Sequence, residues 1–261
     1  MPIREVNPLE LWQSELLLGR DEIIHGFTGR KGGVSEGPYA SLSMSPRRGD
    51  DPDKVHKNEE ILCLALGLNH KNLSSTCQEH TDTVAVIDEL NVGIGVSSPW
   101  DHGVDAVITR LPNVPIMAYA ADCVPLLFYA PDIKAIAAVH SGWRGTEMKI
   151  AEKTALKLAE MGAAVENIIV AIGPAIGLCC YEVSEDVALR FPEGCRNAKG
   201  GGKYMLDLKK SNELMLREIG ITQIDNTAPC TRCHSETFFS HRGQGGVSGT
   251  LAAIIERRES R

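Results

Sequence analysis

Two apolar segments of the chain carry side chains that could do chemistry. Residues 121–128 hold Cys123 between apolar runs, and residues 138–146 hold His140 at the end of an apolar run. Burying an unpaired polar group costs about 1–3 kcal/mol, so a thiol and an imidazole in such surroundings need partners. Taken alone, each is better explained by packing, as a buried thiol or a core histidine with satisfied hydrogen bonds.

The turn that follows His140 favours a functional interpretation. Residues 141–146 connect an expected strand to an expected helix, and Gly142 and Gly145 permit a close approach of the backbone. Free N–H groups at the start of a helix attract anions, and the planar guanidinium of Arg144 suits phosphate or carboxylate. The alternative is that Arg144 only forms a salt bridge with a nearby acid.

Five motifs occur along the chain between about Ile24 and Ile255. They are Gly32–Leu42 (GGVSEGPYASL), Ala121–Leu127 (ADCVPLL), His140–Thr146 (HSGWRGT), Gly173–Gly177 (GPAIG) and Glu236–Ser240 (ETFFS). In sequence and order these motifs resemble the family of laccase-domain proteins, and the resemblance covers most of the chain. Family members carry the name multicopper polyphenol oxidase, are understood chiefly as purine nucleoside phosphorylases with a zinc site, and in some cases are described as peptidoglycan editing factors.

This resemblance implies a fold, a metal site and substrate contacts. The family fold is a layered α/β sandwich with mixed sheets flanked by helices. Two histidines and a cysteine serve as metal ligands and catalytic residues, and they correspond here to His80, Cys123 and His140. Substrate contacts are implied at Ser41, Gly142 and Arg144.

Two short departures from the family pattern leave the metal ligands intact. Thr81-Asp82 follows His80 where relatives commonly place a small residue such as glycine. Ser43-Met44-Ser45 stands where many relatives carry asparagine and leucine. These differences concern the substrate contacts of the N-terminal loop.

The ligand set favours zinc, with copper as the alternative. Two imidazoles and one thiolate leave the fourth position of a zinc ion for water or substrate. Blue-copper oxidases gather histidines in repeated His-x-His pairs, and the eight histidines of this chain include no such pair. The sequence therefore argues against a multicopper laccase reaction.

Three functions remain open at this stage. The first is a zinc-dependent purine nucleoside phosphorylase that acts on adenosine, inosine and methylthioadenosine, with adenosine deamination as a second activity; its partners are the nucleoside and phosphate. The second is an amidase that edits cell-wall muramyl-peptide precursors, with Cys123 as nucleophile or ligand and His140 as base or ligand. The third is a non-enzymatic metal-binding module.

Other cysteines suggest sites that the sequence does not support. Cys230, Cys233 and His234 match a haem-attachment pattern, but no export signal accompanies them, and a zinc site would lack an identifiable fourth ligand. The sequence thus predicts no metal at this motif. The adjacent Cys179 and Cys180 could form a vicinal disulfide, although two free thiols are expected in a reducing cytosol.

The amino-acid composition limits the partners and the location that we expect for the protein. With 27 Lys and Arg against 34 Asp and Glu, the net charge of −7 argues against nucleic acid or an anionic membrane as partner. No signal peptide or membrane-spanning run is apparent, so a cytoplasmic protein is expected. Neither a phosphate-binding loop nor a dinucleotide-binding fingerprint is present.

The elements that must position these residues alternate along the chain. Hydrophobic patterning predicts helices at 51–67, 146–161 and 205–219. Continuous apolar runs near Met117 and Ile136 predict strands that are covered on both faces. No linker-like change of composition interrupts the pattern, so one α/β domain over residues 1–261 is expected. The remaining predicted strands span 23–27, 83–87, 104–109, 124–129, 168–172, 221–224 and 238–255.

Overall fold

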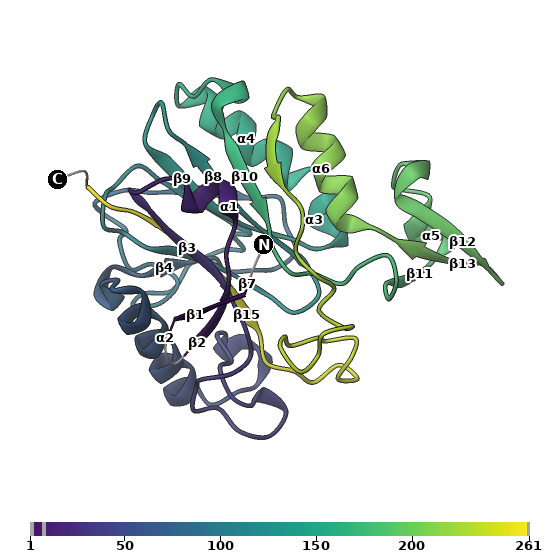
Figure 1. The fold of residues 1–261 in the computed structure, drawn as a ribbon, viewed down its shortest axis with the longest axis horizontal. Coiled ribbons are helices and arrows are strands. Elements are labelled where there is room, and N and C mark those ends of the chain that lie inside the picture. Colours follow the sequence, from purple (N-terminus) through teal and green to yellow (C-terminus); the bar gives the residue numbers. More distant parts are fainter. Residues whose placement is uncertain (1–2, 7–8, 260–261) are drawn as a thin grey trace.

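Two six-stranded mixed sheets form the centre of the computed structural model, which describes residues 3–6 and 9–259 (Figure 1). In the first sheet all neighbours are antiparallel except β4 and β7, and in the second only β5–β6 and β10–β14 are parallel. The first sheet has the order β1 (Ile3–Val6), β2 (Leu9–Trp12), β3 (Ile23–Thr28), β15 (Leu251–Arg257), β7 (Ile116–Ala120), β4 (Ser74–Ser75). The second has the order β14 (Gln223–Asp225), β10 (Ile169–Ile172), β8 (Val124–Ala130), β9 (Ala135–Ser141), β6 (Ala106–Thr109), β5 (Val84–Ile87).

Side chains alternate between layers along the central strands. In β8, Leu126 and Phe128 enter one hydrophobic core while Leu127 and Tyr129 enter another. The second of these cores lies between the two sheets, because it also contains Ile116 of β7. Every residue of β7, β8 and β9 is buried, so the prediction of strands covered on both faces is confirmed.

Helices cover the outer faces of both sheets. The apolar side of α2 packs on the first sheet, and α4 and α6 pack on the second (Figure 1). This α–β–β–α arrangement confirms the predicted layered α/β sandwich. The helices are α1 (Glu15–Leu18), α2 (Pro52–Leu66), α3 (Trp143–Glu147), α4 (Ile150–Glu160), α5 (Glu185–Ala188) and α6 (Leu208–Glu218), with 3₁₀ turns at Gly37–Tyr39, Pro46–Arg48, His70–Asn72, Val165–Asn167 and Glu193–Cys195.

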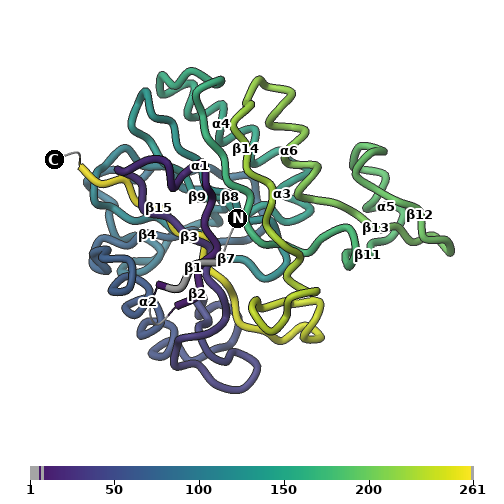
Figure 2. Tube along the Cα trace, in the orientation of Figure 1, coloured from purple at the N-terminus to yellow at the C-terminus, as the bar shows by residue number. Residues whose placement is uncertain are grey.

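A small antiparallel sheet extends from this body. It has the order β11 (Glu182–Ser184), β13 (Lys203–Leu206), β12 (Arg196–Gly200), and α5 lies between β11 and β12 along the chain (Figure 2). None of the helices in the described ranges combines the length and the apolar character that a membrane crossing requires.

Three sequence predictions need correction. The helix expected over 146–161 is two helices, because Lys149 adopts a left-handed φ of 64° that redirects the chain before the buried Ile150. The helix expected from residue 205 begins at Leu208, since β13 extends to Leu206. The expected strand over 238–255 begins only at Leu251, because the preceding segment turns through left-handed glycines, among them Gly245 with a φ of 70°.

Helix α2 agrees closely with its prediction. Its first turn contains Pro52, and the side chain of Asp51 accepts a hydrogen bond from the backbone N–H of Asp53 at 3.0 Å. Its end is set by Gly67, which adopts a left-handed φ of 67°. Both boundaries follow from local chemistry, in which an Asx cap begins the helix and a glycine ends it.

Candidate active site and metal centre

The structure brings His80, Cys123 and His140 together. One potential ligand atom from each lies within 4.8 Å of the others. The two imidazole rings meet edge to face, with centroids 4.9 Å apart. His140 is buried, and the other two side chains are half-buried. This gathering is what the family resemblance implies, and the role of the three residues as ligands stays a prediction.

Two neighbouring strands and one loop supply these residues. Cys123 comes directly before β8, and His140 lies near the end of β9, where it is paired with Pro125. Because β8 and β9 are adjacent and antiparallel, the start of β8 and the end of β9 place the thiol and one imidazole at the same end of this strand pair. His80 comes from the loop between β4 and β5 and has a left-handed φ of 61°.

Asp105 joins the two histidines and was not identified from the sequence. Its fully buried carboxylate accepts a hydrogen bond from Nδ1 of His140 at 2.7 Å. The same carboxylate accepts the backbone N–H groups of His80 at 3.2 Å and Thr81 at 2.9 Å. With Nδ1 directed at Asp105, Nε2 of His140 is the nitrogen available to a ligand or a proton. An acid inside the apolar run 104–108 was the available signal.

Charge pairing controls protonation at this centre. Burial by itself raises the pKa of Cys123, but the charge of His140 and hydrogen bonds from both histidines lower that pKa to about 6. Burial likewise lowers the pKa of His140, while Cys123 and Asp105 outweigh it and raise the pKa to about 9. The site therefore favours a thiolate at neutral pH, which is the form that binds metal or attacks an electrophile.

Gly142 leaves the space beside these groups open. A Cβ atom at this position would lie 3.1 Å from Sγ of Cys123 and 3.6 Å from Nε2 of His80. Both atoms thus border one small space next to the Gly142 backbone. The donor set of two imidazoles and a thiolate fits a zinc ion with three protein ligands.

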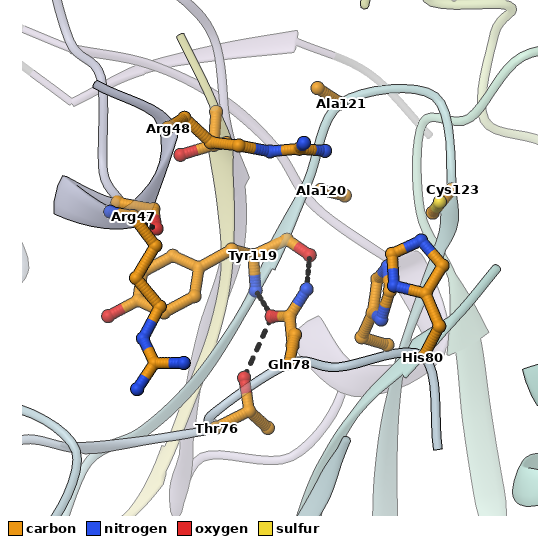
Figure 3. A pocket seen from close by; sticks show the side chains of 12 residues that line it. Arg47, Arg48, Thr76, Gln78, His80, Tyr119, Ala120, Ala121 and Cys123 are labelled. Atoms are coloured by element: carbon orange, nitrogen blue, oxygen red, sulfur yellow. Dashed lines mark hydrogen bonds between the residues drawn. The ribbon is translucent and has the colours of Figure 1, made fainter. Parts of the chain in front are cut away.

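A pocket opens directly beside the three residues. Gln78 fixes its wall, because the side-chain amide donates to the carbonyl of Tyr119 at 2.9 Å and accepts from the N–H of Tyr119 at 2.6 Å (Figure 3). This double hydrogen bond ties the His80 loop to β7. The side chain of Arg48 extends across the pocket towards Ala121 in Figure 3. The lining residues are Ser45, Arg47, Arg48, Thr76, Gln78, His80, Tyr119, Ala120, Ala121, Cys123, His140 and Thr250.

Comparison with known proteins identifies the family. A family model described as multi-copper polyphenol oxidoreductase laccase matches residues 24–258. The chain belongs to this family. The laccase-family membership predicted from the sequence motifs is thereby confirmed.

Relatives of this laccase-family chain include proteins named purine nucleoside phosphorylase. One from Bacteroides thetaiotaomicron is 34% identical over 92% of this chain and 94% of its own length. Another, from Deinococcus radiodurans, is 36% identical over 90% of each chain. The crystal structure of YlmD from Geobacillus stearothermophilus superposes with a TM-score of 0.89 at 32% identity, covering 99% of this chain and 100% of YlmD.

The three substrate residues implied by the resemblance, Ser41, Gly142 and Arg144, all lie outside the pocket lining. Arg144 is exposed, and its guanidinium lies 4.5 Å from the centre of the Trp143 ring. The hydroxyl of Ser41 accepts from the N–H of Gly33 at 3.2 Å and donates to the carbonyl of Arg30 at 3.3 Å. Their roles stay predictions, whereas Arg47 and Arg48 line the pocket without having been identified from the sequence.

A second group of potential ligands corrects a sequence expectation. No fourth ligand was expected near Cys230 and Cys233, but the structure places Cys179 and Cys180 beside them. His234 is not part of the group, and its Nδ1 lies 3.1 Å from the carbonyl oxygen of Cys230. The reason for excluding a metal at this motif is therefore wrong. All eight cysteines are free, so the expectation that Cys179 and Cys180 stay unpaired agrees with the structure.

Proposed function

We propose that this chain is a zinc-dependent purine nucleoside phosphorylase. The observation that carries the proposal is the convergence of His80, Cys123 and His140 beside a pocket with cationic walls. The names of its relatives supply the substrate class, since several of them are called purine nucleoside phosphorylase. Adenosine, inosine and methylthioadenosine are the proposed substrates, with inorganic phosphate as the second reactant.

The proposed reaction replaces one bond at the sugar. An oxygen of phosphate forms a bond to C1′ of the ribose, and the bond from C1′ to the purine nitrogen breaks. The electron pair of that bond leaves with the base, which takes up a proton, and ribose 1-phosphate remains, or methylthioribose 1-phosphate when the substrate is methylthioadenosine. A zinc ion held by the three ligands would supply a Lewis acid that stabilises negative charge.

The chain's own residues have distinct parts in this scheme. We assign phosphate binding to Arg48 and Arg47, which line the pocket and carry guanidinium groups suited to phosphate. Arg144 is a further candidate for phosphate, on the family resemblance. Asp105 fixes the orientation of His140 and the backbone of the His80 loop. Gln78 holds that loop against β7, so it fixes the position of His80 relative to the pocket residues of β7.

Adenosine deamination is proposed as a second activity of the same site. It converts adenosine and water to inosine and ammonia, and it consumes no phosphate. Variants of the phosphate-binding arginines should therefore impair phosphorolysis more than deamination.

One observation favours a different function, the amidase. Cys123, His140 and Asp105 form a chain of thiolate, imidazolium and carboxylate, which is the arrangement of a cysteine nucleophile with an oriented base. In that scheme His80 has no necessary part. Dependence on His80 and on metal therefore separates the two functions.

The test uses purified full-length protein with adenosine, inosine and a muramyl-peptide as alternative substrates. We expect release of adenine or hypoxanthine that requires phosphate, stops after chelation of the metal and returns on addition of zinc. The His80→Ala variant should lose this activity. Amide cleavage that persists in the chelated protein and in His80→Ala would reject the phosphorylase in favour of the amidase.

A further inference from the structure

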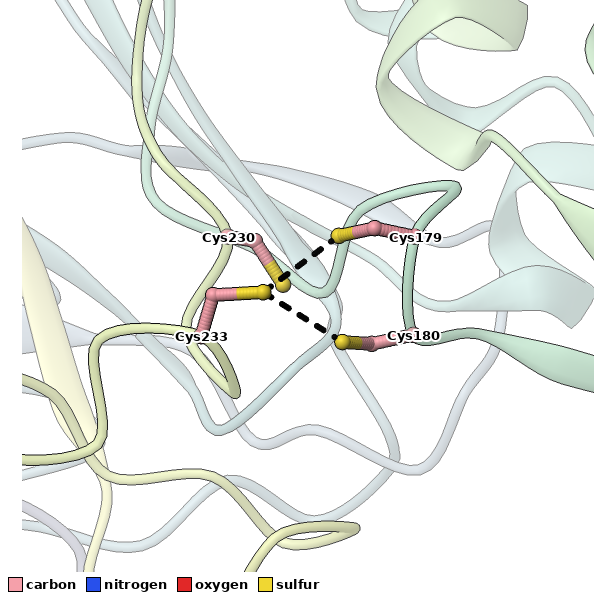
Figure 4. A group of neighbouring side chains, drawn as sticks. All are labelled: Cys179, Cys180, Cys230 and Cys233. Carbon is pink, nitrogen blue, oxygen red and sulfur yellow. Dashed lines mark hydrogen bonds between the residues drawn. The ribbon is translucent and has the colours of Figure 1, made fainter.

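Four cysteines from two distant segments converge on the molecular surface. Cys179 and Cys180 lie in the turn between β10 and β11, and Cys230 and Cys233 lie in the turns that follow β14 (Figure 4). Sγ of Cys233 is 3.5 Å from Sγ of Cys179 and 3.4 Å from Sγ of Cys180. All four sulfur atoms lie within 4.8 Å of one another.

These distances suit a shared metal ion better than disulfides. A disulfide requires sulfur atoms about 2.05 Å apart. A tetrahedral zinc ion with bonds of about 2.3 Å places its four sulfur ligands about 3.8 Å from each other. An iron–sulfur cluster would hold the cysteines farther apart, because several iron and sulfide atoms lie between them. The observed distances therefore fit a single ion with four thiolate ligands better than either alternative.

Backbone contacts hold the two segments in place for this geometry. The N–H of Gly177 donates a hydrogen bond to Sγ of Cys230 at 3.2 Å. The N–H of Thr231 donates to the carbonyl of Ala175 at 3.0 Å, and Ala175 and Cys230 form a parallel bridge. The two-residue spacing between Cys230 and Cys233 is common in structural zinc sites.

We propose that Cys179, Cys180, Cys230 and Cys233 bind one zinc ion as a structural site. All four coordination positions are filled by protein sulfur, which leaves no position for a substrate. The ion would cross-link the turn after β10 to the segment after β14. This inference concerns metal binding and does not depend on any catalytic activity.

The site is connected to the catalytic centre through Asp122. The hydroxyl of Thr231 donates to the carboxylate of Asp122 at 2.6 Å, and the N–H of Ile176 donates to the Asp122 carbonyl at 2.9 Å. Asp122 directly precedes Cys123 and adopts a left-handed φ of 84°. Zinc at the four cysteines would therefore brace the segment that presents Cys123.

The first experiment counts zinc in the purified protein after dialysis against metal-free buffer. We expect two zinc ions per wild-type chain, one in His140→Ala, one in Cys233→Ser and none in the double variant. Cys195→Ala removes a buried thiol outside both groups and serves as the control, with two ions retained. Zinc content that is unchanged by Cys233→Ser would overturn the proposal.

The second experiment remains valid if the cysteine variants fail to fold. X-ray absorption at the zinc edge of His140→Ala should show a shell of four sulfur atoms at about 2.3 Å and no nitrogen. The same protein, denatured in a chelator, should titrate for eight thiols. A nitrogen-containing shell, bound iron in place of zinc, or fewer than eight thiols in a zinc-free protein would each overturn the proposal.

Discussion

Two groups of potential metal ligands contain cysteine, and they differ in donors, burial and surroundings. His80, Cys123 and His140 combine nitrogen with sulfur, lie beside a pocket and depend on a buried carboxylate. The four cysteines offer only sulfur, come from surface turns and are absent from the lining of that pocket. This difference matches the one between catalytic zinc sites, which keep one coordination position open, and structural zinc sites, in which protein ligands fill all four positions.

The two groups also differ in how a buried carboxylate contacts them: Asp105 bonds His140 directly, whereas Asp122 bonds Thr231 beside the cysteines. Asp105 is fully buried and its pKa is lowered, because hydrogen bonds from His140 and backbone N–H groups outweigh the effect of burial. This negative charge keeps His140 in one orientation. At the four-cysteine group, backbone contacts and the hydrogen bond from the Thr231 hydroxyl to Asp122 hold the turns in place, and none of these contacts joins a carboxylate to a cysteine. Orientation of each ligand matters for chemistry, whereas a cross-link needs only proximity.

The largest predicted effect is on activity, and it separates the two groups. We expect Cys123→Ala and His140→Ala to lower phosphate-dependent purine release by about 10²- to 10³-fold, as for loss of a group that stabilises developing charge. Steady-state kinetics with inosine measures this loss. Circular dichroism serves as the control for folding. A folded His140→Ala enzyme with near-normal turnover would reject the assignment of the first group.

The next effect is on stability, and it should appear at the other group. Removing an ion present at about 1,000 times its dissociation constant costs about 4 kcal/mol. For a chain of this size we expect Cys233→Ser to lower the melting temperature by roughly 10 °C. Calorimetry in the presence of free zinc measures the shift, with Cys195→Ala as the control. Equal melting temperatures for wild type and Cys233→Ser would contradict a structural ion.

Phosphate recognition gives a third, smaller effect. Replacing Arg48 by lysine removes the planar guanidinium group and one of its hydrogen bonds to phosphate. The loss should weaken phosphate binding by about 1.5–3 kcal/mol, which raises the KM for phosphate roughly ten- to hundredfold. Arg144→Lys is the matched variant, because this side chain is exposed and stacked on Trp143. We expect the larger effect for Arg48. A phosphate KM raised only in Arg144→Lys would assign phosphate binding to Arg144, at the start of α3.

The smallest of these effects concerns the residue that orients the histidines. Asp105→Asn keeps the shape of the side chain but weakens its bond to His140, so zinc affinity should fall by about 10- to 100-fold. Competition with a chromogenic chelator measures the affinity, and excess zinc should restore activity. Asp101→Asn changes an exposed acid of the same region and should leave affinity unaltered. Normal zinc affinity in Asp105→Asn would show that the carboxylate has no such role.

The sequence predicts the local elements of this fold better than its long-range contacts. The ends of α2 follow from Asp51 and Gly67, and the apolar run of β9 marks a strand covered on both faces. By contrast, nothing near Lys149 indicates a helix break, since the residue lacks the conformational freedom of glycine. Its left-handed backbone arises from packing of the following helix against the sheet.

The two groups of potential metal ligands show the same limit. The first could be assembled only by family resemblance, because His80 and Cys123 are 43 residues apart in the sequence. The contact between Asp105 and His140 arises only in the folded chain, because β6 pairs with β9 and brings the carboxylate to the imidazole. Cys179 and Cys230 are separated by 51 residues, and they meet because β10 pairs with β14. Strand pairing at such separations is not encoded in local patterns.

The most direct test compares purine release by His140→Ala and Cys233→Ser under the same conditions. Phosphate-dependent formation of hypoxanthine from inosine is measured below both melting temperatures, and zinc per chain is determined in the same samples. We predict one remaining zinc ion in each variant, with activity lost in His140→Ala and mostly retained in Cys233→Ser. Retained activity in His140→Ala, or complete loss in a folded Cys233→Ser that still holds its other zinc ion, would contradict the assignment of chemistry to one group and stability to the other.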